Sequence, residues 1–363
     1  MGFAHSSPIF CYSYYAMNIS NILSVLNSGV KDRIFPGAAL SVSIDGFSAH
    51  KIAVGNFTYD EKSPIVSVST IFDIASVTKT IVATAALKLL DLGKINLESA
   101  IGEYLLQIAN TDVGKRITVW NLLTHTSSIN VRMSHLAGDA ISRGAFFKVL
   151  AEYNTKLEPG AEVNYANANT FLLGEIITAV SGVPLDVFIK REVTEPLQMV
   201  DTNYVPSPDI IERIAPTEIE DGVTIQGIVH DPSARGIGGI AGHAGIFSTI
   251  SDLNNFLTMW TEDGVFNGKK VLAKDTVDLA LTNQTPSLNK SSGLGWHLDN
   301  PDYLGHLMPS RTFFHPGFTG TIIAGNISRK CKVAFLSNCT FPHRENHHIK
   351  NEFLKKLFDA VFS

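Results

Sequence analysis

In "FDIASVTKTIVATAALKLLDLG", residues 72–93, a lysine stands among apolar residues. The apolar positions recur at helical spacing, which predicts an amphipathic helix over about 73–92 that is closed by Gly93. These positions are Ile74, Val77, Ile81, Val82, Ala85, Ala86, Leu89 and Leu90. Lys79 falls between them, and buried lysines are rare unless they are paired or used in chemistry. We therefore expect the rest of the chain to supply a partner or a use for Lys79.

Ser76 precedes Lys79 by three residues, so the stretch contains an S-x-x-K pair. Three residues are about one helical turn, which places the two side chains about 5–6 Å apart at their Cβ atoms. Burial disfavours the ammonium form of lysine, so the lysine pKa falls and the amine can accept a proton from a serine hydroxyl. The pair predicts an activated serine, although S-x-x-K alone also occurs by chance in many chains.

The composition is that of a globular protein with a large core. The 363 residues are 45% hydrophobic and 17% charged, which fits one big domain or two closely packed ones. A net charge of −5 and a pI near 6.2 give no electrostatic reason to expect nucleic acid or an anionic membrane as a partner. No apolar run approaches the roughly 20 residues that span a bilayer, so no membrane span is expected.

The first 18 residues, "MGFAHSSPIFCYSYYAMN", have no basic start and no long aliphatic run, so they are not expected to be a signal peptide. Only three cysteines occur, Cys11, Cys331 and Cys339, and this odd number indicates no disulfide framework. Reduced, mostly buried thiols in a cytoplasmic protein are the expectation. An incomplete start would hide an export signal.

The hydrophobic period changes along the chain. Two β-rich runs within 37–55 flank Asp45-Gly46, a strong hairpin signal. Thr118 has the place of a cap before a short helix, and Gly182 with Pro184 ends a longer one. The predicted helices cover 19–29, 117–128, 168–182 and about 347–362, and further strands cover 321–328 and 332–339.

Helices at both termini, strands next to each of them and helices in between predict an α+β fold. Both ends of the chain would form one antiparallel sheet, and the middle would be a mostly helical insertion. We expect a discontinuous sheet domain over 18–72 and 201–363, a mainly helical domain over 73–200, and an N-terminal extension over 1–17.

Two further motifs change the meaning of the S-x-x-K pair. "NYANANT", residues 164–170, contains Tyr165 and Asn167 in a Y-x-N element just before a helix. "FFHPGFTGT", residues 313–321, contains His315-Pro316-Gly317 leading into a strand. The order is serine and lysine, then tyrosine and asparagine, then a basic residue and glycine on a strand.

This order and spacing resembles the class C β-lactamase superfamily, which includes β-lactamases, D-Ala-D-Ala carboxypeptidases, D-aminopeptidases and family VIII carboxylesterases. The resemblance extends over about residues 20–360. It includes the segments "FPGAALSVSIDG", "GKINLESAIGEYL", "ITVWNLLTHTSS", "LLGEIITAVSG", "EPLQMVDTNY" and "GGIAGHAGIFSTISDLNNF". It implies the β-lactamase/transpeptidase-like, penicillin-recognising fold.

The resemblance also implies roles for individual residues. Ser76 would be the acylated nucleophile, with Lys79 as its proton partner and Tyr165 as the proton relay; which of the two is the primary base stays open. The oxyanion hole would be the backbone N–H groups of Ser76 and Phe318. Pro316 has no N–H, which costs nothing because the needed donor lies two residues later. The other substrate-binding residues would be Asn167, His315 and Gly317.

The chain departs from the family pattern at His315, where class C β-lactamases usually carry lysine. A free histidine of pKa about 6.5 is only roughly a quarter charged at pH 7, which weakens a dedicated β-lactamase interpretation. Ser128 stands where glycine is usual, and the loop after it, within 128–145, has no assigned role. His125 is expected to be structural.

Two other motifs suggest a phosphate loop and a zinc site, but each lacks residues that such a site requires. The glycine-rich "GIGGIAGHAG", residues 236–245, lacks the Gly-Lys-Ser/Thr of a phosphate loop and is expected at the cleft rim, where His243 either contacts substrate or bonds within the loop. His343 and His347 lack the H-E-x-x-H spacing of a zinc peptidase.

The expected function is a serine hydrolase that works without metal or cofactor on a small-molecule or short-peptide substrate. D-amino-acid peptide or amide hydrolysis of the D-Ala-D-Ala carboxypeptidase type, or β-lactam hydrolysis, is the leading prediction. A carboxylesterase or acyltransferase of the family VIII type is the alternative within the same chemistry. A catalytically silent binding protein with the same fold is the alternative of another class. The substrate and the oligomeric state have no readable signal.

Overall fold

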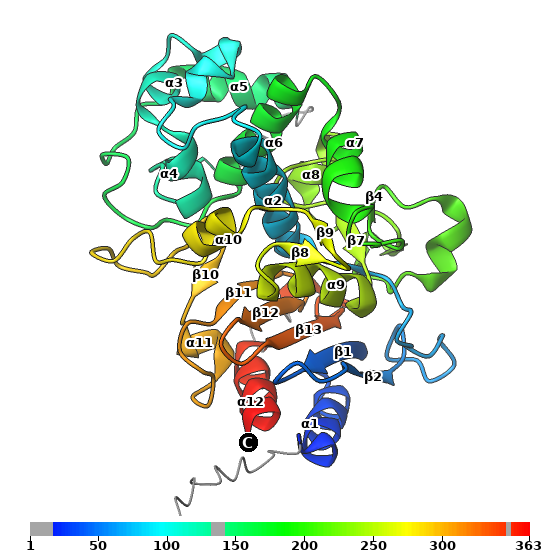
Figure 1. Cartoon of the computed structure of the whole chain (residues 1–363). Helices are drawn as coiled ribbons and strands as arrows, with labels where there is room; N and C mark the ends of the chain where they lie inside the picture. The colour runs from blue at the N-terminus through cyan, green and yellow to red at the C-terminus, as the bar shows by residue number, and fades with distance from the viewer. Residues whose placement is uncertain (1–16, 132–141, 346–349) are drawn as a thin grey trace, which may run out of the picture.

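The computed structural model describes residues 17–131, 142–345 and 350–363 (Figure 1). The expected N-terminal extension over 1–17 therefore lies outside the described residues, apart from Met17, and so does Cys11. Most of the loop that follows Ser128, and His347 of the rejected metal motif, also lie outside them.

A six-stranded antiparallel sheet unites the two ends of the chain (Figure 1). Its order is β10-β11-β12-β13-β1-β2, so strands from the start of the chain pair with strands from its end. The α+β fold predicted from the sequence is confirmed. The strands are β1 (Gly37–Ser43), β2 (His50–Gly55), β10 (His297–Leu298), β11 (Phe313–Pro316), β12 (Ile322–Asn326) and β13 (Cys331–Ser337).

The two faces of this sheet pack against different helices. Successive side chains of a strand point to opposite faces. Leu40 and Phe335 pack with α1 (Ile19–Lys31) and α12 (Lys350–Phe362) on one face. Ala39 and Leu336 belong to the larger core on the other face, where α9 (Ile250–Thr261) packs against β1, β12 and β13. The sheet therefore separates two apolar cores.

The hairpin predicted around Asp45-Gly46 is confirmed, with a longer loop than a two-residue turn. Asp45 and Gly46 both adopt positive φ, at 54° and 80°. The last pair between β1 and β2 joins Val42 to His50, while Ser43 pairs only with Lys332 of β13. The first strand thus stays in the sheet through its other neighbour after it leaves β2.

Helices fill the upper part of the molecule in Figure 1, where α2 lies at the centre. α6 packs against α2, α4 and α7. The helices of this region are α2 (Thr78–Asp91), α3 (Asp112–Arg116), α4 (Val119–Thr124), α5 (Arg143–Glu152), α6 (Asn167–Ser181) and α7 (Leu185–Ile189). Later segments add α8 (Pro232–Gly236), α10 (Lys274–Ala280), α11 (Pro301–Leu304) and the pairs β5 (Glu218–Glu220) with β6 (Val223–Ile225) and β8 (Val265–Phe266) with β9 (Lys269–Lys270).

Three predicted helix boundaries were wrong. α1 continues through Gly29 to Lys31, because a Cβ at Gly29 would lie 2.4 Å from Cζ of Phe35, so this glycine serves close packing and is not a stop. α4 ends early, because His125 takes a left-handed conformation with φ of 58°. The end of α6, in contrast, agrees with the prediction: its last residue is Ser181, and Gly182, with φ of 70°, caps it.

The third correction concerns the stretch around the serine. The helix expected from residue 73 starts only at Thr78. Before it come β3 (Phe72–Asp73) and a 3₁₀ turn, Ala75–Val77. β3 belongs to a small sheet in the order β3-β7-β4, with β7 (Ile246–Ser248) and β4 (Asn203–Tyr204).

The division of the chain at residues 72/73 and 200/201 into two domains stays a prediction. β3 straddles the first boundary, and its partners in the small sheet, β7 and β4, both lie after the second. Within the described ranges, no single helix is long and apolar enough to cross a membrane. α6 with residues 185–194 meets the length and composition only as a pair bent by 80°.

Candidate active site

The serine sits on a turn whose backbone is held from three directions. The Asp73 carboxylate accepts hydrogen bonds from the Ala75 N–H (2.8 Å) and the His230 N–H (2.7 Å). The Thr319 hydroxyl donates to the Asp73 carbonyl (2.7 Å), from the segment after β11. Ala75 has φ of 46°, an unfavourable conformation for a residue with a Cβ. These contacts hold the turn that presents Ser76.

Lys79 lies one turn further, inside the protein, with 1% of its surface exposed. Its Nζ donates to Ser76 Oγ (2.9 Å) and to the His243 carbonyl (2.9 Å). Burial lowers the pKa of Lys79 to about 7, against the opposing effect of the Asp231 carboxylate. The amine is therefore about half neutral near pH 7, in hydrogen-bond contact with the serine hydroxyl.

Tyr165 approaches the same hydroxyl from the segment before α6. Its ring centroid is 5.0 Å from Lys79 Nζ, and it lines the same cavity as Ser76. Desolvation raises the pKa of Tyr165 well above its usual value, more than the nearby Ser76 side chain lowers it. The side chain is 37% exposed, at the wall of a cavity. The phenol is thus protonated at neutral pH and accessible to a ligand.

Three histidine rings surround Tyr165. Their centroids lie 4.7 Å (His125), 5.6 Å (His297) and 5.9 Å (His315) from that of the tyrosine. Burial lowers the pKa of all three, in the case of His297 to about 4. His125 Nδ1 accepts from the Ala166 N–H (3.4 Å), which fits the structural role expected for this residue. The three histidine rings around Tyr165 are therefore neutral at pH 7, and Lys79 is the ionisable amine beside its ring.

His315 lies beneath the cavity. It is 2% exposed, it is not among the residues that line the cavity, and its Nδ1 donates to the Pro316 carbonyl (2.9 Å). Its pKa lies well below the usual value because of burial. A neutral, buried imidazole supplies no positive charge at this position. The lysine that class C β-lactamases usually carry there would supply one.

Gly317 and Phe318 form the edge of the cavity next to Ser76. The Gly317 N–H donates to the Thr321 carbonyl (2.7 Å), and a Cβ on Gly317 would lie 1.9 Å from Thr321 Oγ1. The buried Lys350, the first residue of α12, donates to the Gly317 carbonyl (2.6 Å) and to the Phe318 carbonyl (3.1 Å). Two independent contacts therefore fix the backbone of this edge.

Asn167 and Asp231 face each other on the opposite side of Ser76. Asn167 Nδ2 donates weakly to Asp231 Oδ2 (3.4 Å). Asp231 Oδ1 caps α8 through the Ser233 and Ala234 N–H groups and lies 3.3 Å from His243 Nε2. These bonds hold the Asp231 pKa far below its usual range in spite of desolvation. His243 is fully buried, and its backbone carbonyl accepts the hydrogen bond from Lys79.

The cleft has two lobes that share Ser76, Tyr165 and Phe318. The first, the lysine lobe, has a volume of about 480 Å³. The second, the aspartate lobe, has a volume of about 520 Å³. The lysine lobe is further lined by Lys290, His297, Asn300, Tyr303, Phe314, Pro316, Gly317, Lys350 and Asn351. The other lining residues of the aspartate lobe include Asn130, Asn167, His230, Asp231 and Arg344.

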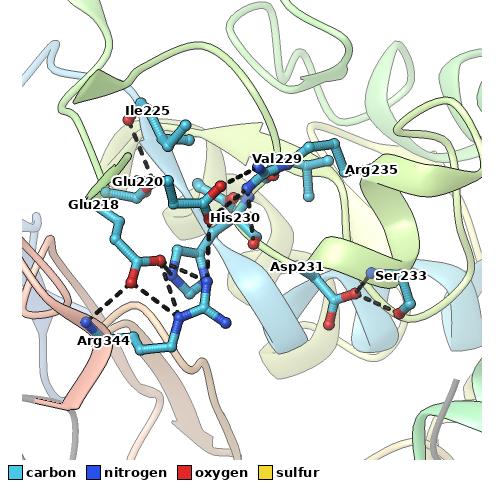
Figure 2. A network of polar contacts seen from close by, with 11 residues as sticks. Glu218, Glu220, Ile225, Val229, His230, Asp231, Ser233, Arg235 and Arg344 are labelled. Carbon is cyan, nitrogen blue, oxygen red and sulfur yellow. Dashed lines mark hydrogen bonds and ion pairs between the residues drawn. The ribbon is translucent and has the colours of Figure 1, made fainter. Parts of the chain in front are cut away.

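Arg344 and His230, which line the aspartate lobe, belong to a network of ion pairs (Figure 2). Arg344 pairs with Glu218 (2.6 Å) and Glu220 (3.1 Å), and Glu220 also pairs with Arg235 (2.6 Å). Glu218 also lies 2.9 Å from His230 Nε2, and the His230 ring stacks on Phe318 at 5.5 Å. The arginines of this wall are thus matched by glutamates.

Several residues of the cleft carried no readable signal in the sequence. Lys290 and Lys350 are single lysines in polar segments, and His297 follows no motif. Asp231 had a weak signal, since Asp-Pro before a short helix marks a cap. Among the described residues, no group of three or more His, Cys, Asp and Glu side chains could hold a metal ion.

Comparisons with known proteins identify the family of the chain. The Beta-lactamase family profile matches residues 24–354. A protein of Escherichia coli O157:H7 named "Putative D-alanyl-D-alanine carboxypeptidase" is 25% identical over 350 residues, covering 85% of this chain and 79% of its own length.

Solved structures share the fold. A class C beta-lactamase superposes with a TM-score of 0.77 at 18% identity, covering 95% of this chain and 96% of its own. EstCE1, described as a hydrolase with promiscuous acyltransferase activity, has a TM-score of 0.75 at 18% identity, with coverages of 95% and 98%. The fold is therefore β-lactamase/transpeptidase-like, and the chain belongs to the Beta-lactamase family of serine hydrolases.

Proposed function

We propose that this chain hydrolyses D-amino-acid peptides or amides, in the manner of a D-Ala-D-Ala carboxypeptidase, through an acyl-enzyme on Ser76, with β-lactams as related acylating substrates. The observation that carries the proposal is the buried Lys79 amine, 2.9 Å from Ser76 Oγ and with a pKa of about 7. An amine of that pKa is a suitable general base at neutral pH.

Acylation begins when neutral Lys79 takes the proton of the Ser76 hydroxyl. The Oγ atom attacks the substrate carbonyl carbon, a C–O bond forms, and the carbonyl electron pair moves to oxygen. The N–H groups of Ser76 and Phe318 would bind that oxyanion, and donors in such positions account for several kcal/mol of transition-state stabilisation. The contacts of Lys350 and Thr321 with the 317–318 backbone support this placement.

The tetrahedral intermediate collapses by breaking the C–N bond, and the leaving amine takes a proton. Tyr165 is suited to deliver it, because its raised pKa keeps the phenol protonated and it lines both lobes of the cleft together with Ser76. Lys79 returns the proton to Tyr165. In deacylation the same pair takes a proton from water as the water oxygen attacks the ester carbon. The bond between that carbon and Oγ then breaks, and the pair returns the proton to Ser76 Oγ. The pKa directions thus favour Lys79 as the base and Tyr165 as the relay.

The choice of substrate class is supported by the relative named for D-Ala-D-Ala carboxypeptidase activity. Asn167 lines the aspartate lobe and offers an amide to a substrate amide group. A second candidate, carboxylester hydrolysis or acyl transfer, is favoured by the apolar Phe314, Tyr303 and Phe318 of the lysine lobe and by the likeness to EstCE1.

Intact-mass spectrometry tests the acyl-enzyme. Incubation with a fluorophosphonate or benzylpenicillin is expected to add one mass increment to the wild-type chain and none to Ser76→Ala. A chain that takes no adduct at any pH between 6 and 9 would instead be a silent binding protein of the same fold.

Turnover of three substrates separates the candidate functions. We expect release of D-alanine from an acetylated D-Ala-D-Ala peptide at a higher kcat/KM than opening of nitrocefin or cleavage of short alkyl esters. The opposite order, with alkyl esters preferred and no D-alanine released, would support the esterase candidate. Activated aryl esters do not discriminate, because any activated serine hydrolyses them.

A further inference from the structure

The two lobes of the cleft differ in charge. Two lysines, Lys290 and Lys350, line the lysine lobe, and among the described residues no aspartate or glutamate does so. We infer that the lysine lobe binds a carboxylate of the substrate and that Lys290 is the cation that pairs with it. This inference rests on the proposed function, because it names the substrate end that the same site recognises.

The backbone of Lys290 is held beside Tyr165. The preceding residue, Asn289, accepts a hydrogen bond from the Val163 N–H (2.9 Å) and donates one to the Val163 carbonyl (3.3 Å), two residues before the tyrosine. The Thr285 hydroxyl donates to the Lys290 carbonyl (2.7 Å). A loop fixed at both of these points keeps the Lys290 side chain at the mouth of the lobe.

The Lys290 ammonium is available to a ligand. Its residue is exposed, and it forms no ion pair with any described side chain. Its charge lies close enough to the wall of the lobe to lower the pKa of His297, after the larger effect of burial. Lys350 is different, since its ammonium is buried against the Gly317 and Phe318 carbonyls.

The other candidate cations of the cleft are committed or neutral. Arg344 of the aspartate lobe pairs with Glu218 and Glu220 (Figure 2), and His315 is buried and neutral. Asp231, which is ionised, would repel a carboxylate placed in the aspartate lobe. A substrate with one free carboxylate is therefore oriented with that end in the lysine lobe, which points to short peptides with an unblocked C-terminus.

The test compares acetyl-D-Ala-D-Ala with its C-terminal amide, which differs only in charge. Each peptide is measured as a substrate and as a competitive inhibitor of p-nitrophenyl acetate hydrolysis, so that binding is read even where cleavage is slow. The wild type is expected to prefer the acid. Lys290→Met is expected to lower the acid-to-amide ratio about fivefold, the size of an exposed charge pair, and Lys290→Arg to retain most of it. Higher salt should reduce the wild-type ratio.

Lys269→Met is the matched control, because Lys269 is an exposed lysine on β9 that does not line the cleft. It should leave the ratio unchanged. Equal binding of acid and amide by the wild type, or an unchanged ratio in Lys290→Met, overturns the inference while ester turnover still supports the proposed function. Absence of both ester turnover and a Ser76 adduct removes the proposed function, and this inference with it.

Discussion

At the scale of single residues, the environment of Lys79 decides what its side chain can do. The four-carbon stem and the amine are both inside the protein, where the ammonium loses its hydration. Its two hydrogen-bond acceptors, Ser76 Oγ and the His243 carbonyl, are neutral. The nearest compensating charge is Asp231, which reduces the effect of burial without cancelling it.

The pH dependence of the reaction follows from this pKa. Because Lys79 has to be neutral to accept a proton, kcat/KM for a neutral ester should be low below pH 6 and rise with pH through an apparent pKa of about 7. A pH profile from 5 to 9 measures it. The rings around Tyr165 change charge well below this range, since the pKa of His297 is about 4. A profile that is flat over these values would contradict the assignment of Lys79 as the base.

Removing the phenol of Tyr165 separates proton transfer from nucleophilic attack. Tyr165→Phe is expected to lower kcat by about 10²- to 10⁴-fold, the usual range for a lost acid–base group. The ring contacts with His125, His297 and His315 would remain, so the thermal midpoint should change little. Kinetics with an alkylamide substrate measure kcat, and thermal unfolding of the same variant measures the midpoint. Unchanged kcat would exclude Tyr165 from the relay.

At the scale of elements, the site depends on how the turn before α2 is attached to the end of β11. Thr319 bonds with the Asp73 carbonyl, and Thr321 bonds with the Ile74 carbonyl (3.1 Å). The segment that follows the sheet strand therefore fixes the turn that carries the serine. The close approach leaves no room for a side chain at residue 317.

Gly317→Ala tests this attachment. The added Cβ would lie 1.9 Å from Thr321 Oγ1 and 2.7 Å from the Ile74 carbonyl oxygen, so the 317–318 backbone has to shift. We expect a loss of kcat/KM of about 10²-fold, as for loss of an oxyanion donor. Gly144→Ala is the control, because a Cβ at that position in α5 meets nothing within 4 Å. It should raise stability by up to about 1 kcal/mol. Equal activities of the two variants would contradict the expectation.

At the scale of the whole molecule, the two chain ends hold each other in place. The Phe35 ring, between α1 and β1, contacts Phe335 of β13 (5.7 Å) and Phe353 of α12 (5.0 Å). The α1 and α12 helices cover one face of the sheet, and the first residues of α12, Lys350 and Asn351, also line the lysine lobe. β11 belongs to this sheet, and Gly317 and Phe318 follow it directly. The packing of the two chain ends therefore supports the edge of the cavity next to Ser76.

Phe35→Ala is expected to lower the free energy of unfolding by about 3–5 kcal/mol, the usual cost of emptying a buried phenylalanine site. Denaturant unfolding followed by circular dichroism measures the change. The apparent pKa of the reaction should stay near 7 in the folded variant, because Phe35 belongs to the core on the other side of the sheet from Lys79. A loss below about 1 kcal/mol would show that neighbouring side chains fill the space left by Phe35, or that the packing of the two chain ends does not stabilise the fold.

The class of the fold and a set of candidate catalytic residues could be predicted from the sequence. Spacing three apart brings Ser76 and Lys79 together on any tight helical turn, and β-rich runs mark strands near both ends of the chain. Each of these signals lies within a single short segment, so it can be recognised without the tertiary structure. The start of α2 was mispredicted because the apolar period continues backwards through residues 74–77, while the contacts of Asp73 with Ala75 and His230 hold that backbone in another conformation.

Only the tertiary structure decided the surroundings of these residues. Lys290, His297, Asp231 and Lys350 come from four separate segments, and no local pattern indicates that they meet around Ser76. The neutral state of His315 and the lowered pKa of Lys79 depend on how completely packing removes water from each group. Desolvation is a property of the assembled volume, so it cannot be read from the neighbours of a residue along the chain.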